Sequence, residues 1–375
     1  MKNQKIPPEY SAIINQRERV ASRPTMIDMF CGCGGLSQGF HDAGYEVLFG
    51  IDHDKPSLST YDANFGHGKG ASIDLFSKHF IDDIELKLKE SANSIDVVVA
   101  GPPCQGFSLT GSRNFDDPRN QLYLSVFEVV KKFKPKAFLI ENVKGMKTLY
   151  KGDVVAEILC RFKKLGYKVS DPQILTSADY GVPQIRERLF IVGVKEEYDL
   201  FKFPPSIKTQ ETYLSCEEAI GNLPPRNDSY GLEHDEYLYP PLTDYQKFMQ
   251  VNSTSLRNHV ATNHTDYVKS VISLVPEGKN YKALPEGVGD SRKFNEAWTR
   301  YHSKKPSRTI DTGHRNHFHY KWNRVPTVRE NARLQSFRDD FVFSGTKTQQ
   351  YKQVGNAVPP LLAYHLAKQL LNYIK

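Results

Sequence analysis

Residues 25–40 have the sequence TMIDMFCGCGGLSQGF, and this stretch decides the fold. Its first half is a short apolar run typical of a buried strand, and its second half is a glycine turn that leads into a helix. A strand, a glycine turn and a helix start form the cofactor corner of a doubly wound α/β sheet. The glycines depart from the pattern G-x-G-x-x-G, because the third position after Gly34 is Ser37. A pyrophosphate site is therefore disfavoured, and an ordinary tight turn stays the alternative.

Strands and helices continue to alternate beyond this corner. Short apolar runs predict strands, and longer amphipathic runs between them predict helices. The expected strands are residues 26–30, 47–51, 95–100, 137–140 and 189–194, and the expected helices are residues 58–65, 121–133 and 154–165. This order predicts a parallel sheet with helices on both faces.

The composition changes after residue 194. Residues 200–350 are rich in Pro, Asn, Ser, Thr and Tyr and show few clean periods, which predicts a smaller, irregular domain. Residues 361–374 are apolar at helical spacing and could pack on the first domain. We therefore expect one domain of residues 1–200, completed by residues 350–375, and a second domain of residues 201–349.

Two acids after the first strand suit an adenosine. Asp52 ends the second strand, where a carboxylate can accept both hydroxyls of a ribose, and Asp74 is placed to reach the adenine. A cofactor with adenosine and no phosphate, such as S-adenosylmethionine (AdoMet), meets these needs. Cys31 and Cys33 could suggest a metal, but no pair of Cys or His follows at ligand spacing, so we predict none.

A cysteine follows the strand expected at residues 95–100. Residues 101–108 have the sequence GPPCQGFS, and catalytic groups of open α/β sheets collect beyond the carboxyl ends of the strands. Cys104 is better placed there for nucleophilic work than for packing, with a buried inert thiol as the alternative. A zinc deaminase would need a second cysteine where this chain has Phe107.

An acid and two arginines add to this candidate site. Glu141 ends the next strand, where burial can hold a carboxyl protonated for proton donation; the alternative is a capping or surface acid. Arg186 and Arg188 lead into a strand, and period two places them on one face. Two guanidiniums can favour a thiolate and bind phosphate or a base carbonyl, with a surface ion pair to Glu187 as the alternative.

Charge is distributed unevenly along the 375 residues. Fifty Lys and Arg against 43 Asp and Glu give a formal net charge of +7, and residues 291–330 alone carry +7 from ten basic and three acidic residues. Residues 211–240 carry −6. Aromatic residues of the basic window include Trp298, Tyr301, Phe318, Tyr320 and Trp322. Interleaved cations and rings suit a nucleic acid with exposed bases, whereas a solvated surface over core aromatics is the alternative.

Other features restrict the class of protein. No stretch approaches the ~18 consecutive apolar residues of a membrane span, and the N-terminus lacks the apolar run of a secretory signal. Five cysteines are an odd number, which argues against a disulfide framework and for a reducing interior. We expect a cytoplasmic protein with no membrane partner.

Six motifs in one order carry a resemblance. Phe-x-Gly-x-Gly-Gly begins at Phe30 and is followed by Pro-Pro-Cys-Gln, Glu-Asn-Val, Gln-x-Arg-x-Arg, Lys-Pro-Ser-Arg-Thr-Ile and Gln-Val-Gly-Asn-Ala-Val-Pro-Pro. Over residues 25–195 and 305–375 the chain resembles the cytosine-5 DNA methyltransferases, in particular the compact methylases of bacterial restriction–modification systems. The resemblance implies an AdoMet-dependent methyltransferase with a Rossmann-like doubly wound sheet and a smaller, irregular target-recognition domain.

The resemblance also implies catalytic roles. Cys104 would attack C6 of a cytosine flipped out of the duplex, and Glu141 would protonate or hydrogen-bond its N3. Arg188 would contact O2, and Arg186 would sit near the thiolate. Carbon 5 would then take the methyl group of AdoMet.

Binding roles follow from the same resemblance. AdoMet would contact eight residues: Phe30, Gly32, Gly34, Asp52, Asp74, Pro102, Leu122 and Asn356. Gln105 and Ser108 would contact DNA from a loop that closes over it. Arg315 would contact DNA outside this loop, and Arg308 would organise the recognition domain. Asp52 stands where a Glu is often found, and the shorter carboxylate could serve the same contact.

Residues 201–303 contain no motif and are expected to read bases in the major groove. The candidates in and after this span are Arg257, Asn258, His259, Asn263, His264, Arg315, Asn316 and His317. The histidines of residues 314–319 could hold a metal, but alternation along a strand brings only His317 and His319 together, so we predict none. The expected partner is double-stranded DNA with a short specific site, bound by a monomer that works beside a separately encoded restriction endonuclease.

Two other functions stay open. The tRNA-directed branch of the family is similar in the core but carries Thr at the position of Ser108 and a Cys-Phe-Thr signature that this chain lacks. A catalytically inert DNA-binding regulator with the same fold would be expected to have lost Cys104 or Glu141, and both are present.

Overall fold

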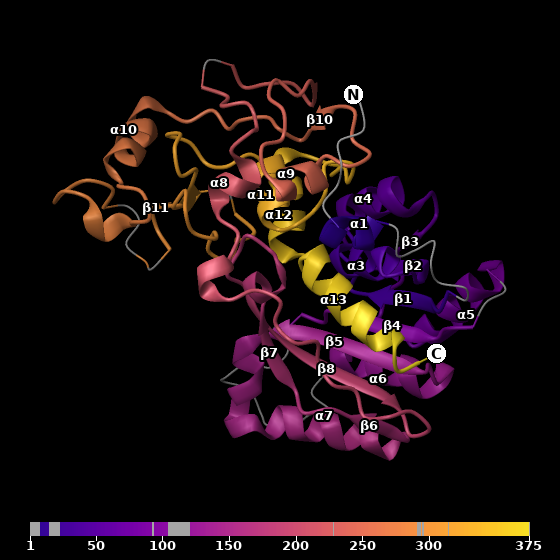
Figure 1. Ribbon diagram of the computed structural model, residues 1–375. Helices are drawn as coiled ribbons and strands as arrows, with labels where there is room; N and C mark the ends of the chain where they lie inside the picture. Colours follow the sequence, from indigo (N-terminus) through magenta and orange to yellow (C-terminus); the bar gives the residue numbers. More distant parts are fainter. Residues whose placement is uncertain are drawn as a thin grey trace. The chain divides into compact units, whose positions relative to one another are not determined.

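The structure is a computed structural model that describes residues 8–14, 23–91, 94–103, 121–227, 229–290, 294, 296–313 and 315–374. The chain forms two compact units. The sheet unit consists of residues 13–176, 187–205 and 362–375, and the loop-rich unit consists of residues 1–12, 177–186 and 206–361. The boundary at residues 186 and 187 falls inside the Gln-x-Arg-x-Arg motif. Figure 1 shows the elements of both units.

The described residues of the sheet unit form one sheet of eight strands. They are β1 (Thr25–Met29), β2 (Glu46–Ile51), β3 (Gly70–Ala71), β4 (Val97–Ala100), β5 (Ala137–Val143), β6 (Tyr167–Val169), β7 (Gln173–Thr176) and β8 (Glu187–Lys195). Their order is β3-β2-β1-β4-β5-β8-β6, with β7 also paired to β8. The strands from β1 to β5 are parallel, which confirms the predicted α/β fold.

The prediction of a wholly parallel sheet is wrong at one edge. Strand β8 pairs antiparallel with β5, β6 and β7. It follows the short strands β6 and β7 without a crossover helix, so it enters between β5 and β6 in the opposite direction. Apolar periodicity identifies a strand but carries no information about its direction.

Helices connect the parallel strands and cover the sheet (Figure 1). They are α3 (Gly35–Asp42), α4 (Lys55–Phe65), α5 (Phe80–Ser91), α6 (Gln121–Phe133) and α7 (Asp153–Lys164), with the 3-10 helix η3 (Lys144–Gly152) before α7. Helix α4 begins three residues before the predicted start, because Asp54 accepts a hydrogen bond from Ser57 N and caps it. Ile84, Val126 and Ile158 of three of these helices pack on the buried strand residues in one core.

The C-terminal helix α13 (Pro360–Leu371) confirms the packing that its apolar spacing predicts. Tyr45 Oη donates to Ala367 O over 3.1 Å, and Tyr373 lies against Phe201 with ring centroids 5.3 Å apart. The last residues of the chain therefore share a core with its first strands. Neither this helix nor any other in the described ranges has the length and apolarity to cross a lipid bilayer.

The elements of the loop-rich unit are short. Its helices are α8 (Cys216–Ile220), α9 (Asp244–Met249), α10 (Asp266–Leu274), α11 (Val328–Leu334) and α12 (Lys347–Asn356), together with the first residues of α1 (Pro8–Ile14) and the 3-10 helices η4 (Ser177–Tyr180), η5 (Gln210–Thr212) and η6 (Tyr281–Ala283). Strand β9 (His234–Asp235) pairs with β10 (Leu256–Arg257), and β11 (Thr299–Arg300) pairs with β12 (His317–Phe318). Four of these α-helices begin at capping boxes headed by Ser215, Thr243, Thr327 and Thr346. Local hydrogen bonds define these helices, which are too short to show a clear apolar period.

Most aromatic residues of the basic window 291–330 belong to the core. Trp298, Tyr301 and Phe318 are at most 3% exposed, and Arg300 and Arg324 are also buried. The prediction that rings and cations alternate on a nucleic-acid surface is wrong for these residues, because a unit with short elements uses the rings to build its core. Among the described residues of the window, five cations are exposed: Lys304, Lys305, Arg308, Arg315 and Lys321.

Candidate active site

The loops after β1, β2 and β4 meet at one edge of the sheet. Met29 of β1 is paired with Ile51 and with Ala100, the last residues of β2 and β4. Gly101 N continues the ladder by donating to Met29 O over 3.1 Å. The carboxyl ends of these strands therefore lie together, at the position where open α/β folds bind their ligands.

The glycine loop after β1 has an unusual backbone. Phe30 and Gly32 have positive φ angles of 61° and 52°, and Gly34 has φ of 101°. A Cβ on Gly34 would lie 2.5 Å from the ring of Phe65, so this position admits no side chain. A Cβ on Gly32 would meet nothing within 4 Å. Space is therefore open beside Gly32, where a ligand can approach the backbone.

A buried polar network fixes the helix start under this loop. Asp28 Oδ2 accepts from Ser37 Oγ over 2.7 Å, and the same hydroxyl lies 2.7 Å from Tyr61 Oη. Burial raises the pKa of Asp28 to about 7. None of these residues was predicted to be functional, although an acid inside an apolar strand is a signal in the sequence.

Asp52, the residue predicted to bind a ribose, holds the glycine loop. Its Oδ2 accepts from Gly32 N over 2.9 Å, and its Oδ1 accepts from two backbone N–H groups of residues 53–54. Oδ2 keeps a lone pair for a further donor, such as a ribose hydroxyl. Asp74 is exposed, and its Oδ1 accepts from Phe76 N. Two carboxylates at this edge suit a ligand with hydroxyls and repel a phosphate.

The other predicted cofactor residues are divided between the units. Phe30 and Leu122 are partly buried against the core of the sheet unit, and Pro102 is buried. Asn356 belongs to the loop-rich unit, where it ends α12 and is exposed.

Glu141 and Arg188 form an ion pair in the sheet unit. Arg188 Nε lies 3.0 Å from Glu141 Oε1, and the two side chains are 17% and 13% exposed. Arg188 is paired with Val143 across β5 and β8, so Glu141, two residues along β5, lies on the same face. A Cβ on Gly101 would lie 3.6 Å from Glu141 Oε2. The carboxylate therefore also faces the segment that leads to Cys104.

Asn142 ties β5 to that segment. It is buried, and its Nδ2 donates to Pro102 O over 3.2 Å. Asn142 belongs to the motif Glu-Asn-Val, in which the sequence predicted a role for Glu141 alone. Cys104, Gln105 and Ser108, the predicted nucleophile and two predicted DNA contacts, lie outside the described residues.

The two arginines of Gln-x-Arg-x-Arg have different partners. Arg188 is paired with Glu141. Arg186 is 2% exposed, and its Nη1 donates to Gly355 O over 2.9 Å within the loop-rich unit. The predicted placement of both arginines on one face of a strand is wrong, because β8 begins only at Glu187 and Arg186 lies before it.

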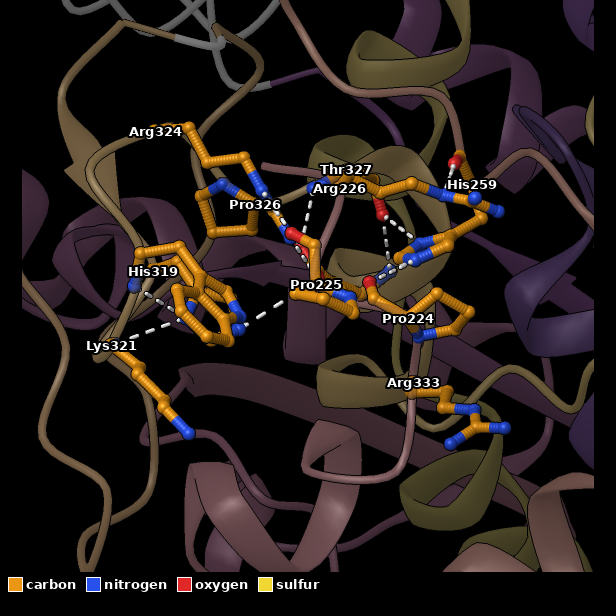
Figure 2. A network of polar contacts seen from close by, with 12 residues as sticks. Pro224, Pro225, Arg226, His259, His319, Lys321, Arg324, Pro326, Thr327 and Arg333 are labelled. Atoms are coloured by element: carbon orange, nitrogen blue, oxygen red, sulfur yellow. Dashed lines mark hydrogen bonds and ion pairs between the residues drawn. The ribbon is translucent and has the colours of Figure 1, made fainter. Parts of the chain in front are cut away.

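A buried polar network in the loop-rich unit includes Arg324 and His319 (Figure 2). The Arg324 guanidinium donates to both oxygens of Glu330 over 2.7 Å, and His319 Nε2 lies 3.7 Å from Glu330. The backbone N–H groups of Lys321 and Trp322 donate to His319 Nδ1, so the ring proton is on Nε2, toward Glu330. Burial alone would raise the pKa of Glu330, but Arg324 holds it well below its usual range.

His259 belongs to the same network. Its Nδ1 lies 2.8 Å from Thr327 Oγ1 and its Nε2 lies 2.8 Å from Pro224 O. Burial lowers the pKa of His259 to about 4 and that of His319 to about 3. The candidacy of His259 as a base-reading residue is wrong, because the ring is buried with both nitrogens engaged. Asn258 is buried in the same way and donates to a backbone carbonyl.

Arg308 and Arg315 are both exposed. Arg308 Nη1 lies 3.0 Å from Glu296 Oε1, and Glu296 Oε2 lies 3.3 Å from His317 Nε2. The hydrogen bond from His317, with the charge of Arg308, holds the pKa of Glu296 below its usual value. His317 is itself buried, which also removes it as a base-reading residue.

Within the described ranges, no three side chains of His, Cys, Asp or Glu are grouped so that they could hold a metal ion. Cys31 and Cys33 are buried, and burial raises the pKa of both thiols, whereas a metal ligand must be a thiolate. His317 and His319 have separate carboxylate partners.

Known proteins resemble the chain over nearly its whole length. Residues 24–372 match the family of C-5 cytosine-specific DNA methylases. The type II methyltransferase M.DdeI of Desulfomicrobium norvegicum is 37% identical over 93% of this chain and 89% of its own. The type II methyltransferase M1.HphI of Haemophilus parahaemolyticus is 39% identical over 92% of this chain and 86% of its own.

A solved structure supports the same relationship. A protein described as a DNA modification methyltransferase encoded within an E. coli prophage has a TM-score of 0.71 to this chain at 26% identity, and the similarity covers 93% of this chain and 99% of that one. The family match at residues 24–372 includes every motif named above. The chain therefore belongs to the C-5 cytosine-specific DNA methylase family and is a DNA cytosine-5 methyltransferase of the type II restriction–modification kind.

Proposed function

We propose that the enzyme transfers a methyl group from AdoMet to carbon 5 of a cytosine in one short DNA sequence, through a covalent intermediate on Cys104. The observation that carries this proposal is the Glu141–Arg188 ion pair at 3.0 Å, beside Gly101 at the start of the segment that leads to Cys104. An acid oriented by a cation next to a candidate nucleophile is the arrangement that covalent catalysis needs.

Each protein group has one task in the reaction. The Cys104 thiolate adds to C6 of a cytosine flipped out of the duplex, which forms a carbon–sulfur bond and pushes an electron pair toward N3. Glu141 gives N3 a proton or a hydrogen bond, so that the negative charge is neutralised and C5 becomes nucleophilic. Arg188 orients Glu141 and contacts O2.

The second half of the reaction restores aromaticity. Once C5 carries the methyl group, water acting as the base removes the C5 proton. The electron pair of that C–H bond re-forms the C5–C6 double bond, and the Cys104 thiolate leaves as the carbon–sulfur bond breaks. Glu141 recovers its proton as N3 returns to the neutral base.

AdoMet supplies an electrophilic methyl group when it is bound. The space beside Gly32 and the lone pair on Asp52 Oδ2 fit a nucleoside without phosphate. The same ligand is assigned to six other residues: Phe30, Gly34, Asp74, Pro102, Leu122 and Asn356.

We assign catalysis to residues 1–200 with 350–375, and recognition of double-stranded DNA to residues 201–349. The exposed cations of the basic window, Arg308 and Arg315 among them, support contacts to phosphates, and Gln105 and Ser108 are assigned contacts near the target base. Methylation would protect host DNA in the cytoplasm from a partner restriction endonuclease. A monomer suffices if each strand is methylated in a separate event.

The experiment that tests this function uses labelled AdoMet with unmethylated genomic DNA and, in parallel, with total tRNA, followed by base-resolution mapping of 5-methylcytosine. Label within one short recurrent DNA sequence is expected. Label on tRNA alone would overturn the DNA substrate, and label on neither by an enzyme that binds DNA would favour an inert regulator. Cys104→Ser should abolish transfer and keep DNA binding nearly intact; substantial turnover by this variant would contradict the covalent route.

A further inference from the structure

Arg186 contacts the backbone of the segment that carries Asn356. Its Nη1 donates to Gly355 O over 2.9 Å, and its Nη2 donates to Asn356 O over 3.4 Å. Nη1 also lies 3.5 Å from Ile310 O. The side chain is 2% exposed, so the cost of taking a guanidinium out of water is offset by these carbonyl contacts. All of these residues belong to the loop-rich unit.

Gln184 contacts Ile310 directly and is linked to the segment of Asn356 through Gln335. Its Oε1 accepts from Ile310 N over 3.2 Å, and its Nε2 donates to Gln335 Oε1. Gln335 Nε2 in turn donates to Ala357 O over 2.5 Å. Together with the two carbonyls bound by Arg186, three successive backbone carbonyls accept hydrogen bonds from buried side chains. A segment held at three successive carbonyls has little freedom to change its backbone angles.

Close packing adds to this restraint, yet one side chain of the segment is exposed. A Cβ on Gly355 would lie 2.2 Å from Asp311 O, so only glycine allows these backbones to approach so closely. The residues before Asn356, from Gln353 to Gly355, are buried, whereas Asn356 is exposed. An exposed amide on a fixed backbone can bind a ligand without a further cost of ordering the chain.

We propose that Arg186 and Gln184 are positioning residues for the cofactor: Arg186 directly, and Gln184 through Gln335, fix the backbone at residues 355–357, and Asn356 is thereby presented to AdoMet. The inference rests on the proposed function in one respect, the role of Asn356 toward AdoMet. It gives Arg186 a task away from the cysteine thiolate and the target base. The motif Gln-x-Arg-x-Arg is then divided, because its first two residues order the cofactor segment and Arg188 orients Glu141.

The test is the binding of AdoMet to the full-length enzyme, measured by titration calorimetry without turnover. Arg186→Lys keeps the positive charge but loses the planar guanidinium, whose two Nη groups donate to the carbonyls of Gly355 and Asn356. We expect Kd and KM for AdoMet to rise about tenfold, which is the effect of one lost hydrogen bond to a charged donor. The value of kcat at saturating AdoMet and the Kd for DNA should change less than about twofold.

Arg329→Lys is the matched control. Arg329 is fully buried in the same unit and donates to the carbonyls of Arg257, Arg338 and Phe341, none of which lies in the cofactor segment. The control variant should lose thermal stability to a similar degree and keep its affinity for AdoMet. Equal losses of affinity in the two variants would overturn the positioning role, as would an Arg186→Lys enzyme with lowered kcat and unchanged affinity.

Two further variants complete the experiment. If Arg186→Lys does not fold, Gln335→Met removes the donor to Ala357 O, and a severalfold rise in Kd for AdoMet is expected; an unchanged Kd contradicts the proposal. Asn356→Ala separates the possible failures. If it leaves AdoMet binding unchanged, the cofactor role of Asn356 is wrong and the inference falls with it. If it weakens binding while Arg186→Lys does not, the positioning role alone is wrong.

Discussion

Arg188 and Glu141 are diagonal neighbours on one face of the sheet, and their ion pair is closed at 3.0 Å. Both side chains are largely buried, so solvent screens their attraction less than it screens a surface pair. The guanidinium holds Oε1 of the carboxylate, and Oε2 faces Gly101. The orientation of the acid is therefore set by the pleat of two adjacent strands and does not depend on a loop.

Glu141→Gln should lower the rate of methyl transfer by about 10²–10³-fold, because an amide cannot give a proton to N3 of the target base. Single-turnover measurements with saturating DNA and AdoMet isolate this step. Lys144→Met is the control, since it breaks the exposed pair between Lys144, which directly follows β5, and Glu187 of β8, and should leave the rate unchanged. A Glu141→Gln enzyme with the normal rate would remove Glu141 from the chemistry.

Glu330→Gln should lower the free energy of unfolding of the loop-rich unit by about 3–5 kcal/mol, because it leaves the Arg324 guanidinium buried without a charged partner. Urea unfolding followed by tryptophan fluorescence measures this unit, since both tryptophans of the chain, Trp298 and Trp322, lie in it.

Glu296→Gln is the control for this prediction. Glu296 pairs with Arg308 in a bridge that is 42% and 48% exposed, so the loss should stay below about 1 kcal/mol. Similar losses of unfolding free energy in the two variants would show that burial does not increase the contribution of the Arg324–Glu330 pair to stability.

The loop-rich unit should lose stability as the pH falls from about 6.5 to about 4, partly because of His259. Burial lowers the pKa of His259 from 6.5 to about 4 in the folded state, so the unfolded chain binds the proton first. The contribution of the neutral ring to the free energy of unfolding is fully present above pH 6.5. It is lost as the pH falls toward about 4, the pKa of His259 in the folded state. The difference between the pKa values of His259 in the unfolded and folded states corresponds to about 3 kcal/mol of unfolding free energy.

In His259→Gln the decline in unfolding free energy over this pH range should be smaller by about that amount. His67→Gln, which replaces an exposed histidine, should keep the decline of the parent enzyme. Urea unfolding at a series of pH values measures both variants. Parallel pH curves for His259→Gln and the parent would mean that folding does not lower the pKa of His259.

Local patterns in the sequence predicted the elements that depend on local interactions. The 13 residues of α6 have a clean apolar period, and the structure gives this helix the predicted bounds. The direction of β8 and the partners of Arg186 depend on contacts between segments distant in the chain, about which periodicity says nothing. The same is true of His259, whose partners Pro224 and Thr327 are 35 and 68 residues away. A polar side chain in an irregular span thus cannot be assigned to the surface or to the core from sequence alone.

Gly34→Ala should weaken AdoMet binding by more than about tenfold. The residue has φ of 101°, and a Cβ would lie 2.5 Å from the Phe65 ring, so the glycine loop must shift to accept it. Gly68→Ala is the matched control in the same unit, because Gly68 also has a positive φ, of 76°, but a Cβ there meets nothing within 4 Å. Both variants carry backbone strain, and only the first crowds the proposed cofactor site. Calorimetric titration of AdoMet should therefore show a large rise in Kd for Gly34→Ala and little change for Gly68→Ala, and equal affinities would place the cofactor away from the glycine loop.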